Sequence, residues 1–302
     1  MKQVFVIILH FKGKEFTRQC LLSLRQLKTP ELATKFVVVD NHSPEPIDDF
    51  KQDFPGVVFL KNKKNLGFAE GNNVGIKYAL KQGADYVLIL NNDTIVDKDL
   101  LVQLIVAAGK DGKVGIVAPK IYFAPGYEYH QAKYKPSERG KVFWYAGGKI
   151  DWQNVLCSHR GVDEVDKGQY DKQIATDFAS GCAMLIKREV LEKIGFLDKR
   201  YFLYLEDVEF CQRAKRAGFK VIYHPKAKLW HFNASSSEVG GELHDYFITR
   251  NRLLFGMKYA SWRTKLNLIQ ESVRLLLAGR PWQKVAIKDY YLKNFARGSW
   301  HD

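Results

Sequence analysis

The chain has 302 residues, of which 46% are hydrophobic and 26% are charged, so it can bury a sizeable core. This composition excludes an intrinsically disordered protein, and no apolar run in the sequence reaches the ~18 residues of a membrane-spanning helix. The formal net charge is +14, and residues 251–302 carry ten Lys/Arg against three Asp/Glu, a local excess of +7. Such a basic segment favours an anionic partner: a nucleic acid, a membrane surface or a phosphorylated substrate.

Strands and helices alternate over the first 120 residues. Apolar runs predict strands at Val4–Leu9, Lys35–Val39, Val57–Leu60, Tyr86–Leu90 and Val114–Pro119. Helical periodicity predicts helices at Phe16–Leu27, Glu70–Gln82 and Leu100–Ala108. Strand–helix repeats of this kind imply right-handed crossovers and a parallel sheet.

The regularity ends near residue 120. Residues 122–172 mix Gly, aromatic and charged residues, which predicts loops with short antiparallel strands. From Ala179 an apolar segment, a polar helix and a His-containing strand follow, and residues from about 243 onward predict helices.

Two features bear on the cellular location. The run Val4–Leu9 is short and no small-residue cleavage site follows it, so we interpret it as a strand and not as a signal peptide. The four cysteines show no metal-ligand spacing, and a reduced intracellular protein is the simplest context. We therefore expect a cytoplasmic protein, and peripheral attachment to the inner face of the cytoplasmic membrane stays open.

The strand at Tyr86–Leu90 runs directly into Asn91-Asn92-Asp93. An unbroken apolar run suits a strand buried on both faces of a parallel sheet, and ligands of such sheets bind at the carboxyl ends of the strands. A carboxylate there can hold a divalent cation against the phosphates of a substrate. Taken alone, a strand that ends in a turn is the simpler explanation.

Neither of the two common phosphate-binding loops is present in the sequence. A Rossmann fingerprint would place G-x-G-x-x-G directly after the first strand, where His10–Lys14 stands instead, and no P-loop occurs. The nearest glycine cluster, at Gly67, Gly71 and Gly75, follows the third strand. The first half is therefore predicted to be a nucleotide-binding fold of another kind.

Eight further segments carry the strongest signal through their order and spacing. They are Val37–Ser43, Asn65–Asn73, Leu90–Thr94, Ser180–Met184, Gly195–Asp198, Phe202–Arg213, Trp230-His231 and Arg250-Asn251. Together they resemble the family 2 inverting glycosyltransferases, specifically the bacterial rhamnosyltransferase-like members, over about residues 3–255.

This resemblance implies an α/β chain of the GT-A fold, in which a Rossmann-like nucleotide-binding sheet is merged with an acceptor region. We expect a catalytic domain at residues 1–242, with a donor-binding half at about 1–120 and an acceptor and catalytic half at about 121–242. A C-terminal helical segment at 243–302 is expected to follow.

The resemblance places the donor site at a strand end and in a loop before a helix. Asp40 ends a strand, so its carboxylate could accept from the imino N–H of a pyrimidine, or it could cap a turn. Asn65, Gly67 and Asn72 belong to the loop and helix start, where Gly67 would permit close backbone approach to the nucleotide. Arg250 could approach the diphosphate, or it could be a surface arginine.

Asn91-x-Asp93 corresponds to the D-x-D element of this family, with Asn in the first position, so both residues belong to the expected donor site. Asp93 is the best candidate ligand for Mg²⁺ or Mn²⁺, which would offset charge on the departing diphosphate. His231 matches the second metal-side position of the family, although a lone His beside Trp is often structural. A His ligand would favour Mn²⁺ weakly.

Glu206-Asp207 is the candidate catalytic pair. Inversion by direct displacement needs one carboxylate to take the proton of the acceptor hydroxyl. The resemblance assigns that role to Asp207 and an orienting or acceptor-binding role to Glu206, but the residues alone do not separate the two, and both suit the acidic start of a helix. Ser180, Gly181 and Cys182 are implied to line the acceptor pocket, and a tight turn before a buried strand is equally compatible.

The expected function is therefore metal-dependent, inverting sugar transfer from a nucleoside-diphosphate sugar, with dTDP-rhamnose or a UDP-sugar as donor. The acceptor would be a glycan or a polyprenyl-diphosphate-linked precursor of a surface polysaccharide. A sugar-1-phosphate nucleotidyltransferase would need a Gly- and Arg-rich loop after the first strand, which is missing. A non-enzymatic basic nucleic-acid-binding module is disfavoured by the ordered acidic motifs, so no nucleic acid is expected.

The C-terminal segment supports two interpretations. Within Lys265–Ala278, five apolar residues share one face at helical spacing: Leu266, Ile269, Val273, Leu276 and Leu277. Trp262, Trp282, Trp300 and several basic residues flank the helices. This face either docks on the catalytic domain or lies on an anionic bilayer, with Lys/Arg toward the headgroups.

Overall fold

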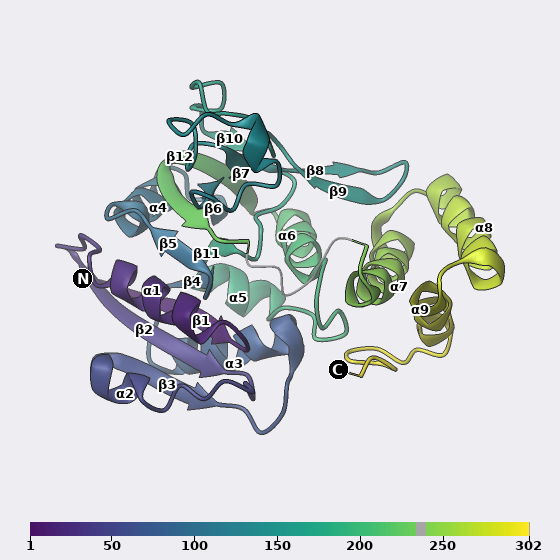
Figure 1. Cartoon of the computed structure of the whole chain (residues 1–302), viewed down its shortest axis with the longest axis horizontal. Helices are drawn as coiled ribbons and strands as arrows, with labels where there is room; N and C mark the ends of the chain where they lie inside the picture. The colour runs from purple at the N-terminus through teal and green to yellow at the C-terminus, as the bar shows by residue number, and fades with distance from the viewer. Residues whose placement is uncertain (234–239, 302) are drawn as a thin grey trace.

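The computed structural model describes residues 1–233 and 240–301. Residues 234–239, at the end of the expected catalytic half, and Asp302 lie outside the described residues. A large mixed sheet with the strand order β10-β12-β6-β11-β4-β1-β2-β3 forms the body of the protein, and β5 and β7 add to it beside β12 and β6 (Figure 1). The GT-A architecture expected from the sequence is confirmed by this arrangement and by the structural comparisons described below.

The strands of the main sheet are β1 (Lys2–His10), β2 (Leu32–Asp40), β3 (Val57–Lys61), β4 (Tyr86–Asn91), β5 (Thr94–Val96), β6 (Val114–Phe123), β7 (Phe143–Tyr145), β10 (Ile174–Ala175), β11 (Ala183–Lys187) and β12 (Lys220–His231). A separate hairpin consists of β8 (Gly148–Asp151) and β9 (Leu156–His159). The helices are α1 (Lys14–Leu24), α2 (Phe50–Asp53), α3 (Gly67–Lys81), α4 (Leu100–Gly109), α5 (Arg188–Ile194), α6 (Glu206–Arg216), α7 (Glu242–Tyr259), α8 (Trp262–Ala278) and α9 (Pro281–Tyr291).

Strands β3, β2, β1 and β4 are parallel, as the strand–helix alternation predicts. Side chains on the two faces of β1 contact different helices: Ile7 lies against Gly75 of α3, and His10 shares a 2.8 Å hydrogen bond with Thr17 of α1. Because helices cover both faces, the side chains on both faces are buried, which explains the unbroken apolar runs of these strands.

The other half of the sheet is mixed, in contrast to the expected parallel sheet. Strand β11 runs antiparallel to both of its neighbours, β4 and β6, and β12 runs parallel to β6. Strand β6 also continues four residues past Pro119, where the sequence analysis ended it. Strand β12 carries a bulge between His224, which pairs with Pro119, and Lys228. Such an irregularity accommodates a proline, which has no backbone N–H to donate.

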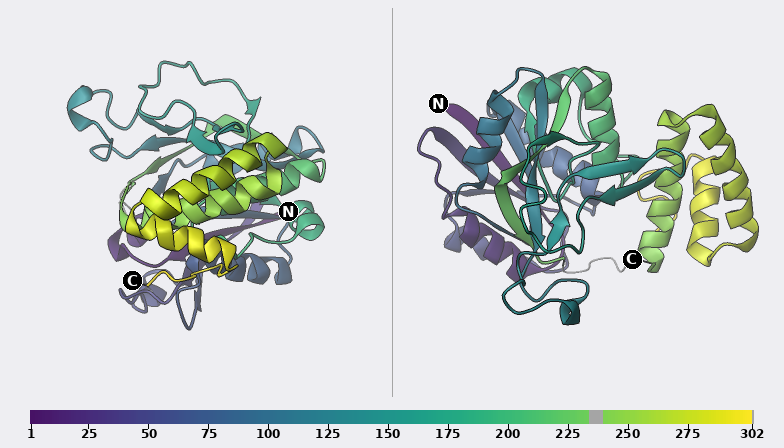
Figure 2. Two further views of the ribbon diagram at one scale, coloured as in Figure 1. Left: turned by 90° about the vertical axis from the view of Figure 1, so that its right-hand side faces the viewer. Right: turned by 90° about the horizontal axis from the view of Figure 1, so that it is seen from above.

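Helices α7, α8 and α9 form a layer beside the sheet, with α8 farthest from it (Figures 1 and 2). The β8–β9 hairpin reaches from the body of the protein to this layer, where Trp152 stacks on Phe255 of α7 with ring centroids 5.7 Å apart. No helix of the described residues is long and apolar enough to cross a membrane. The helices expected after residue 243 are present as α7, α8 and α9. The division into a catalytic domain and a C-terminal segment stays a prediction.

The contact between α3 and β1 generates a stability prediction. A Cβ atom on Gly75 would lie 2.4 Å from Cγ2 of Ile7, so Gly75→Ala should destabilise the protein by about 1–3 kcal/mol through overpacking. Helix propensity alone would make the Ala variant more stable by about 1 kcal/mol. A loss of stability would therefore identify overpacking against Ile7 as the dominant effect. Urea unfolding measures it, and Gly112→Ala, where nothing lies within 4 Å of the added Cβ, is the control. A Gly75→Ala protein as stable as the control variant would contradict the prediction.

Candidate active site

The expected site residues gather at the carboxyl edge of the parallel strands. Strand β2 ends at Asp40 beside His10 of β1, and β4 ends at Asn91 beside Leu9 of β1. The carboxyl edge of an open α/β sheet is the usual ligand-binding position. The topology therefore brings Asp40 and Asn91, which are far apart in sequence, to one side of the molecule.

Asp40 is nearly buried and takes part in a turn. One carboxylate oxygen accepts from the backbone N–H of Ser43 at 2.8 Å, and the other lies 3.8 Å from Nζ of Lys61. The hydrogen bond from Ser43 matches the turn-capping role that the sequence offered as the alternative for Asp40. Contact with a pyrimidine base stays a prediction.

Asn41, which the sequence analysis did not single out, organises the predicted donor loop. Its side-chain amide donates to Oδ1 of Asn65 at 2.9 Å, and its Oδ1 accepts from the backbone N–H of Leu66 and from Nδ2 of Asn62, both at 3.0 Å. Oδ1 of Asn65 in turn accepts from the N–H of Gly67 at 2.9 Å. The side-chain amides of Asn41, Asn62 and Asn65 thus hold the predicted donor loop in one conformation. In the sequence, Asn41 was marked only by its position directly after Asp40 in the segment Val37–Ser43.

Gly67 and Asn72 shape the start of α3. Gly67 has φ +74°, and a Cβ atom there would lie 2.4 Å from a ring carbon of Phe202, so the close approach it permits is to this side chain. Asn72 is fully buried and donates to the carbonyl of Phe68 at 2.9 Å, and its Oδ1 has no partner among the described residues. Direct contact of either residue with a nucleotide stays a prediction.

Asp93 and His231 lie together, as the resemblance implied. Strand β5 pairs antiparallel with β12, which places Thr94 opposite His231. Nε2 of His231 is 3.1 Å from Oδ1 of Asp93. His231 is buried, its ring packs edge-on against Trp144 at 4.6 Å, and its Nδ1 has no partner among the described residues.

A divalent cation fits this pair in part. Two cis ligands at the ~2.1 Å metal–ligand distance of an octahedral site lie about 3.0 Å apart, close to the observed N–O separation. Asp93 and His231 would hold the ion, and the remaining ligands would be diphosphate oxygens and water. No group of three or more His, Cys, Asp or Glu residues suited to a metal occurs in the described part of the chain, so the protein alone offers an incomplete ligand set.

Glu206 and Asp207 begin α6 but have different surroundings. Glu206 is 4% exposed, and its Oε2 has no hydrogen-bond partner among the described residues. Asp207 is partly exposed and accepts two backbone hydrogen bonds, from Gly181 and from Val208, both at 2.7 Å. Glu206 is therefore a buried carboxyl group, and Asp207 is a carboxyl group oriented by two backbone N–H donors.

The burial of the pair changes its protonation. Loss of solvation raises the pKa of Glu206 well above its usual range, and the neighbouring Asp207 raises it further, so both effects favour the neutral acid. Burial also raises the pKa of Asp207, but the N–H donors of Gly181 and Val208 stabilise its charged form. Of the two, Asp207 is the one whose environment supports a carboxylate.

The Ser180–Cys182 turn joins the catalytic pair to the end of β4. The N–H of Gly181 donates to Asp207, and the carbonyl of Cys182 accepts from the N–H of Asn91 at 2.8 Å. A Cβ on Gly181 would lie 3.0 Å from the ring of Phe68, so the turn also touches the start of α3. The expected acceptor turn thus connects the donor, metal and catalytic elements.

The loop before the catalytic pair has an unusual backbone. Phe202, Tyr204 and Leu205 have φ of +63°, +70° and +68°, a region that costs roughly 1–3 kcal/mol for a non-glycine residue and clusters at functional sites. Nδ2 of Asn251 lies within 2.7–2.9 Å of the carbonyl oxygens of Tyr201, Leu203 and Tyr204. Asn251 of α7 therefore holds the loop that delivers Glu206 and Asp207.

Arg250 is not the surface arginine that the sequence left open as the alternative. It is fully buried, and its guanidinium donates to the carbonyls of Arg200 and Tyr201 and to the hydroxyl of Tyr246, at 3.1–3.2 Å. These contacts engage the guanidinium within the protein, and its contact with a diphosphate stays a prediction. Arg250 supports the same loop as Asn251.

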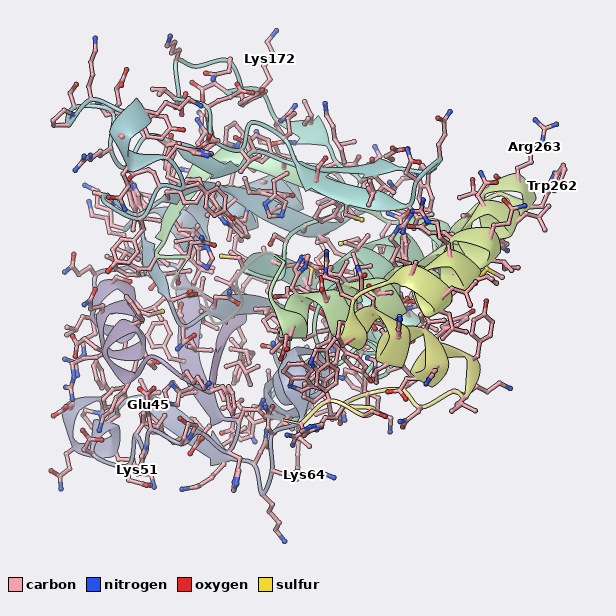
Figure 3. All side chains as sticks on the ribbon, turned by 45° about the vertical axis from the view of Figure 1, so that its right-hand side comes forward. Glu45, Lys51, Lys64, Lys172, Trp262 and Arg263 are labelled. Carbon is pink, nitrogen blue, oxygen red and sulfur yellow. The ribbon has the colours of Figure 1, made fainter. Side chains whose placement is uncertain are left out.

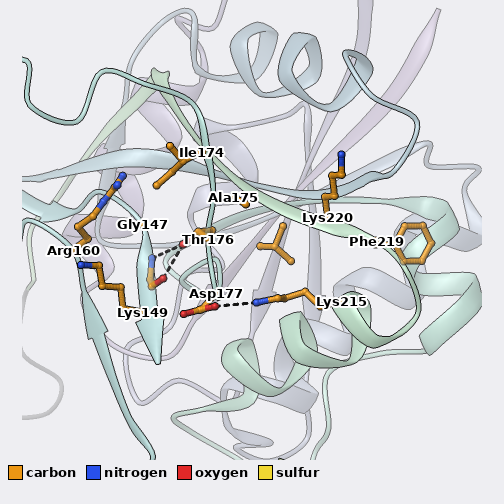
Figure 4. A pocket seen from close by; sticks show the side chains of 12 residues that line it. Gly147, Lys149, Arg160, Ile174, Ala175, Thr176, Asp177, Lys215, Phe219 and Lys220 are labelled. Atoms are coloured by element: carbon orange, nitrogen blue, oxygen red, sulfur yellow. Dashed lines mark hydrogen bonds and ion pairs between the residues drawn. The ribbon is translucent and has the colours of Figure 1, made fainter. Parts of the chain in front are cut away.

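A cavity of about 430 Å³ lies at the other end of α6, between the β8–β9 hairpin and β12 (Figure 4). Its basic residues are largely engaged: Lys215 pairs with Asp177 at 3.0 Å, Lys220 pairs with Asp111 at 2.6 Å, and Arg160 lies over the ring of Tyr170. None of the sequence-predicted site residues lines this cavity.

The architecture is that of known nucleotide-sugar enzymes. The structure resembles GalNAc-T7, solved with UDP, GalNAc and Mn²⁺, with a TM-score of 0.61 at 16% identity over 90% of this chain and 55% of that chain. It also resembles a mannosyltransferase from Pyrobaculum calidifontis, solved with GDP-mannose and Mn²⁺, with a TM-score of 0.57 at 16% identity over 98% and 76% of the two chains. The fold therefore defines a protein of GT-A architecture.

Residues 3–256 match the family described as "Glycosyltransferase like family 2", and the chain belongs to this family. It is 26% identical over 217 residues to a low-salt glycan biosynthesis hexosyltransferase of Haloferax volcanii, covering 72% of this chain and 62% of the relative. It is 26% identical over 198 residues to the N-acetylglucosaminyl-diphospho-decaprenol L-rhamnosyltransferase of Mycobacterium tuberculosis, covering 62% of each protein. A dTDP-rhamnosyl transferase of Shigella flexneri is 25% identical over 195 residues, which cover 65% of this chain and 58% of the relative. The matched region thus spans less than two thirds of the length of each of these relatives.

The contacts of Asn251 generate a prediction about the loop. Asn251→Ala removes the donor for three loop carbonyls, so it should lower the free energy of unfolding by about 1–3 kcal/mol. Turnover should fall more than donor affinity, because two of the three carbonyls, those of Leu203 and Tyr204, lie directly before Glu206 and Asp207, whereas the loop contacts α3 through Phe202. Steady-state kinetics and nucleotide calorimetry measure the two effects, with the exposed Asn267→Ala as control. Equal losses of turnover and donor affinity would contradict a specific effect on the pair.

Proposed function

We propose that the protein transfers a sugar from a nucleoside-diphosphate sugar to a hydroxyl acceptor with inversion at the anomeric carbon. One observation carries the proposal: the Ser180–Cys182 turn hydrogen-bonds both to Asp207 and to Asn91. A candidate base is thereby held next to the strand end where Asp93 would bind the leaving group. The family membership favours this reaction over nucleotidyl transfer and over nucleic-acid binding.

In this reaction Asp207 is the general base. Each of its oxygens accepts one backbone N–H, which fixes the direction of the carboxylate and leaves lone pairs for the proton of the acceptor hydroxyl. As the hydroxyl oxygen forms its bond to the anomeric carbon, the bond to the diphosphate breaks on the opposite side, which inverts the configuration. Burial raises the pKa of Glu206, and a neutral Glu206 can donate a hydrogen bond to the acceptor.

Asp93 and His231 are the residues that would hold Mg²⁺ or Mn²⁺. The bound ion supplies positive charge beside the diphosphate as it departs. Support comes from the 3.1 Å separation of the two side chains and from the two similar structures, which were solved with Mn²⁺.

The proposed donor is dTDP-rhamnose, with a UDP-sugar as the alternative, and the proposed acceptor is a glycan or a polyprenyl-diphosphate-linked saccharide. Support for the donor comes from the names of the Shigella and Mycobacterium relatives, and support for the lipid-linked acceptor from the name of the latter. A screen of nucleotide sugars for hydrolysis, followed by NMR of the anomeric configuration of the transferred sugar, tests the donor and the stereochemistry. A product that retains the anomeric configuration would contradict inversion.

The assignment of the base gives a kinetic prediction. Asp207→Asn should preserve the fold and donor affinity and lower turnover by roughly 10²–10⁴, because the amide cannot take a proton. Glu206→Gln is nearly isosteric with the neutral acid, so it should change turnover far less and appear mainly in the KM of the acceptor. If Glu206→Gln loses turnover while Asp207→Asn keeps it, the two roles must be exchanged.

The metal proposal gives a prediction on ion removal. Excess EDTA should abolish transfer, and added Mn²⁺ or Mg²⁺ should restore it. Asp93→Ala should cost about 3 kcal/mol in kcat/KM, roughly a hundredfold, and should reduce Mn²⁺ binding in the presence of the nucleotide. Asp111→Ala, at the opposite edge of the sheet, removes a carboxylate without touching the site and is the matched control. Full transfer activity in excess chelator would rule the proposal out.

A further inference from the structure

One face of α8 carries a continuous row of exposed apolar side chains, here called the apolar stripe. It consists of Trp262, Leu266, Ile269, Val273, Leu276 and Leu277. Leu266 and Val273 are each 51% exposed, and Leu277 is 75% exposed. Figure 3 shows Trp262 and Arg263 at the outer end of this helix, pointing away from the rest of the protein. Exposed apolar patches of this kind mark interaction surfaces.

The apolar stripe is not the packing face of the helix. Thr264, Leu268 and Ser272 are the buried residues of α8. At 100° per residue Thr264 and Leu268 lie well round the helix from the stripe, and Ser272 lies between them and the edge of the stripe. Leu268 packs against Gly256 of α7, and the hydroxyl of Thr264 donates to the carbonyl of Trp152 at 3.2 Å. The helix is therefore already anchored by one face, and docking on the catalytic domain does not account for the stripe.

Basic side chains border the apolar stripe on both sides. By helical geometry Lys265 lies along one edge, and Arg263 and Arg274 lie along the other. The acidic residues nearby are occupied within the protein, since Glu271 pairs with Arg252 at 2.8 Å and Asp289 is buried. The face thus combines apolar bulk at its centre with a rim of positive charge that no carboxylate of the described residues pairs.

A further apolar edge adjoins the stripe at the end of α9. The hydroxyl of Tyr291 shares a 2.7 Å hydrogen bond with Oγ of Ser272, which places this half-exposed aromatic ring next to α8. Leu292, which follows it, is 77% exposed, and Lys293 beside it is exposed as well. An aromatic ring with a polar tip, next to apolar and basic residues, is the composition of a membrane–water interface.

We propose that the apolar stripe binds the surface of an anionic lipid bilayer. Helix α8 lies in the plane of the interface, with the stripe among the acyl chains near the headgroups and with Lys265, Arg263 and Arg274 at the lipid phosphates. Self-association through the same face is disfavoured, because a two-fold contact would bring two basic rims together. This inference does not rest on the proposed function, since it concerns a surface and not the reaction.

Vesicle flotation of the full chain tests the proposal. The protein should float with vesicles of equal parts phosphatidylcholine and phosphatidylglycerol and much less with phosphatidylcholine alone. Binding to the anionic vesicles should weaken at about 1 M salt, where the screening length falls to about 3 Å. Absence of flotation with anionic vesicles would overturn the proposal.

A pair of matched variants tests the stripe itself. Leu266→Ser with Val273→Ser should lower vesicle partitioning at least about tenfold, because two bulky side chains no longer enter the interface. Asn267→Ser with Ala278→Ser makes the same number of neutral changes at exposed positions of α8 that lie beyond the arginine edge of the stripe, and should leave partitioning unchanged. Because all four positions are exposed, both variants should keep the wild-type thermal unfolding midpoint.

Two further readouts separate the alternatives. Transfer to a soluble acceptor should be unaffected in both double variants, so loss of membrane binding is distinguishable from failure of the proposed reaction. Light scattering after size exclusion should show a monomer. A dimer that dissociates only in the stripe variant, together with equal vesicle binding of both variants, would assign the stripe to self-association and overturn the proposal.

Discussion

The site depends on one side chain that lies outside it. The amide of Asn251 contacts three backbone carbonyls of the loop that leads into Glu206 and Asp207. That loop contains three non-glycine residues with positive φ, a backbone state that persists only where the surroundings over-determine it. Helix α7 supplies this constraint through adjacent residues, because Arg250 donates to the carbonyls of Arg200 and Tyr201 just before the strained positions.

The same arrangement separates two carboxyl groups that are neighbours in the sequence. The left-handed residue Leu205 precedes α6, and the helix begins with Glu206 buried and Asp207 directed at the Ser180–Cys182 turn. The environment, and not the residue type, therefore separates a buried carboxyl group with a raised pKa from a carboxyl group oriented by two backbone N–H donors. This difference is the observation on which the proposed roles of the two residues rest.

Much of the fold was predictable because its signals are local. The apolar runs place each parallel strand correctly, although β1 and β2 extend beyond them at both ends. The two residues that the family motifs grouped, Asp93 and His231, come together through the pairing between β5 and β12. What escaped prediction depends on contacts distant in sequence. Strand β5 has only three residues, which is too short for a sequence signal. Strand β6 continues past Pro119 because its partner strand carries a bulge there. Nothing in the sequence near Arg250 and Asn251 reveals that both bind a loop about fifty residues earlier.

The contact between α3 and the strained loop has a consequence for how the two substrates influence each other. The N–H groups of Phe68 and Ala69, at the start of the donor-side helix, both donate to the carbonyl of Phe202. In many nucleotide-binding folds such groups are free to bind phosphate, but here they are bonded to the loop that carries the catalytic pair. In the proposed reaction the donor and acceptor sides would therefore share a structural element, so free energy that one substrate contributes to ordering it would be gained by the other. Thermodynamic linkage would make this coupling reciprocal, and the affinity for either substrate would depend on the occupancy of the other.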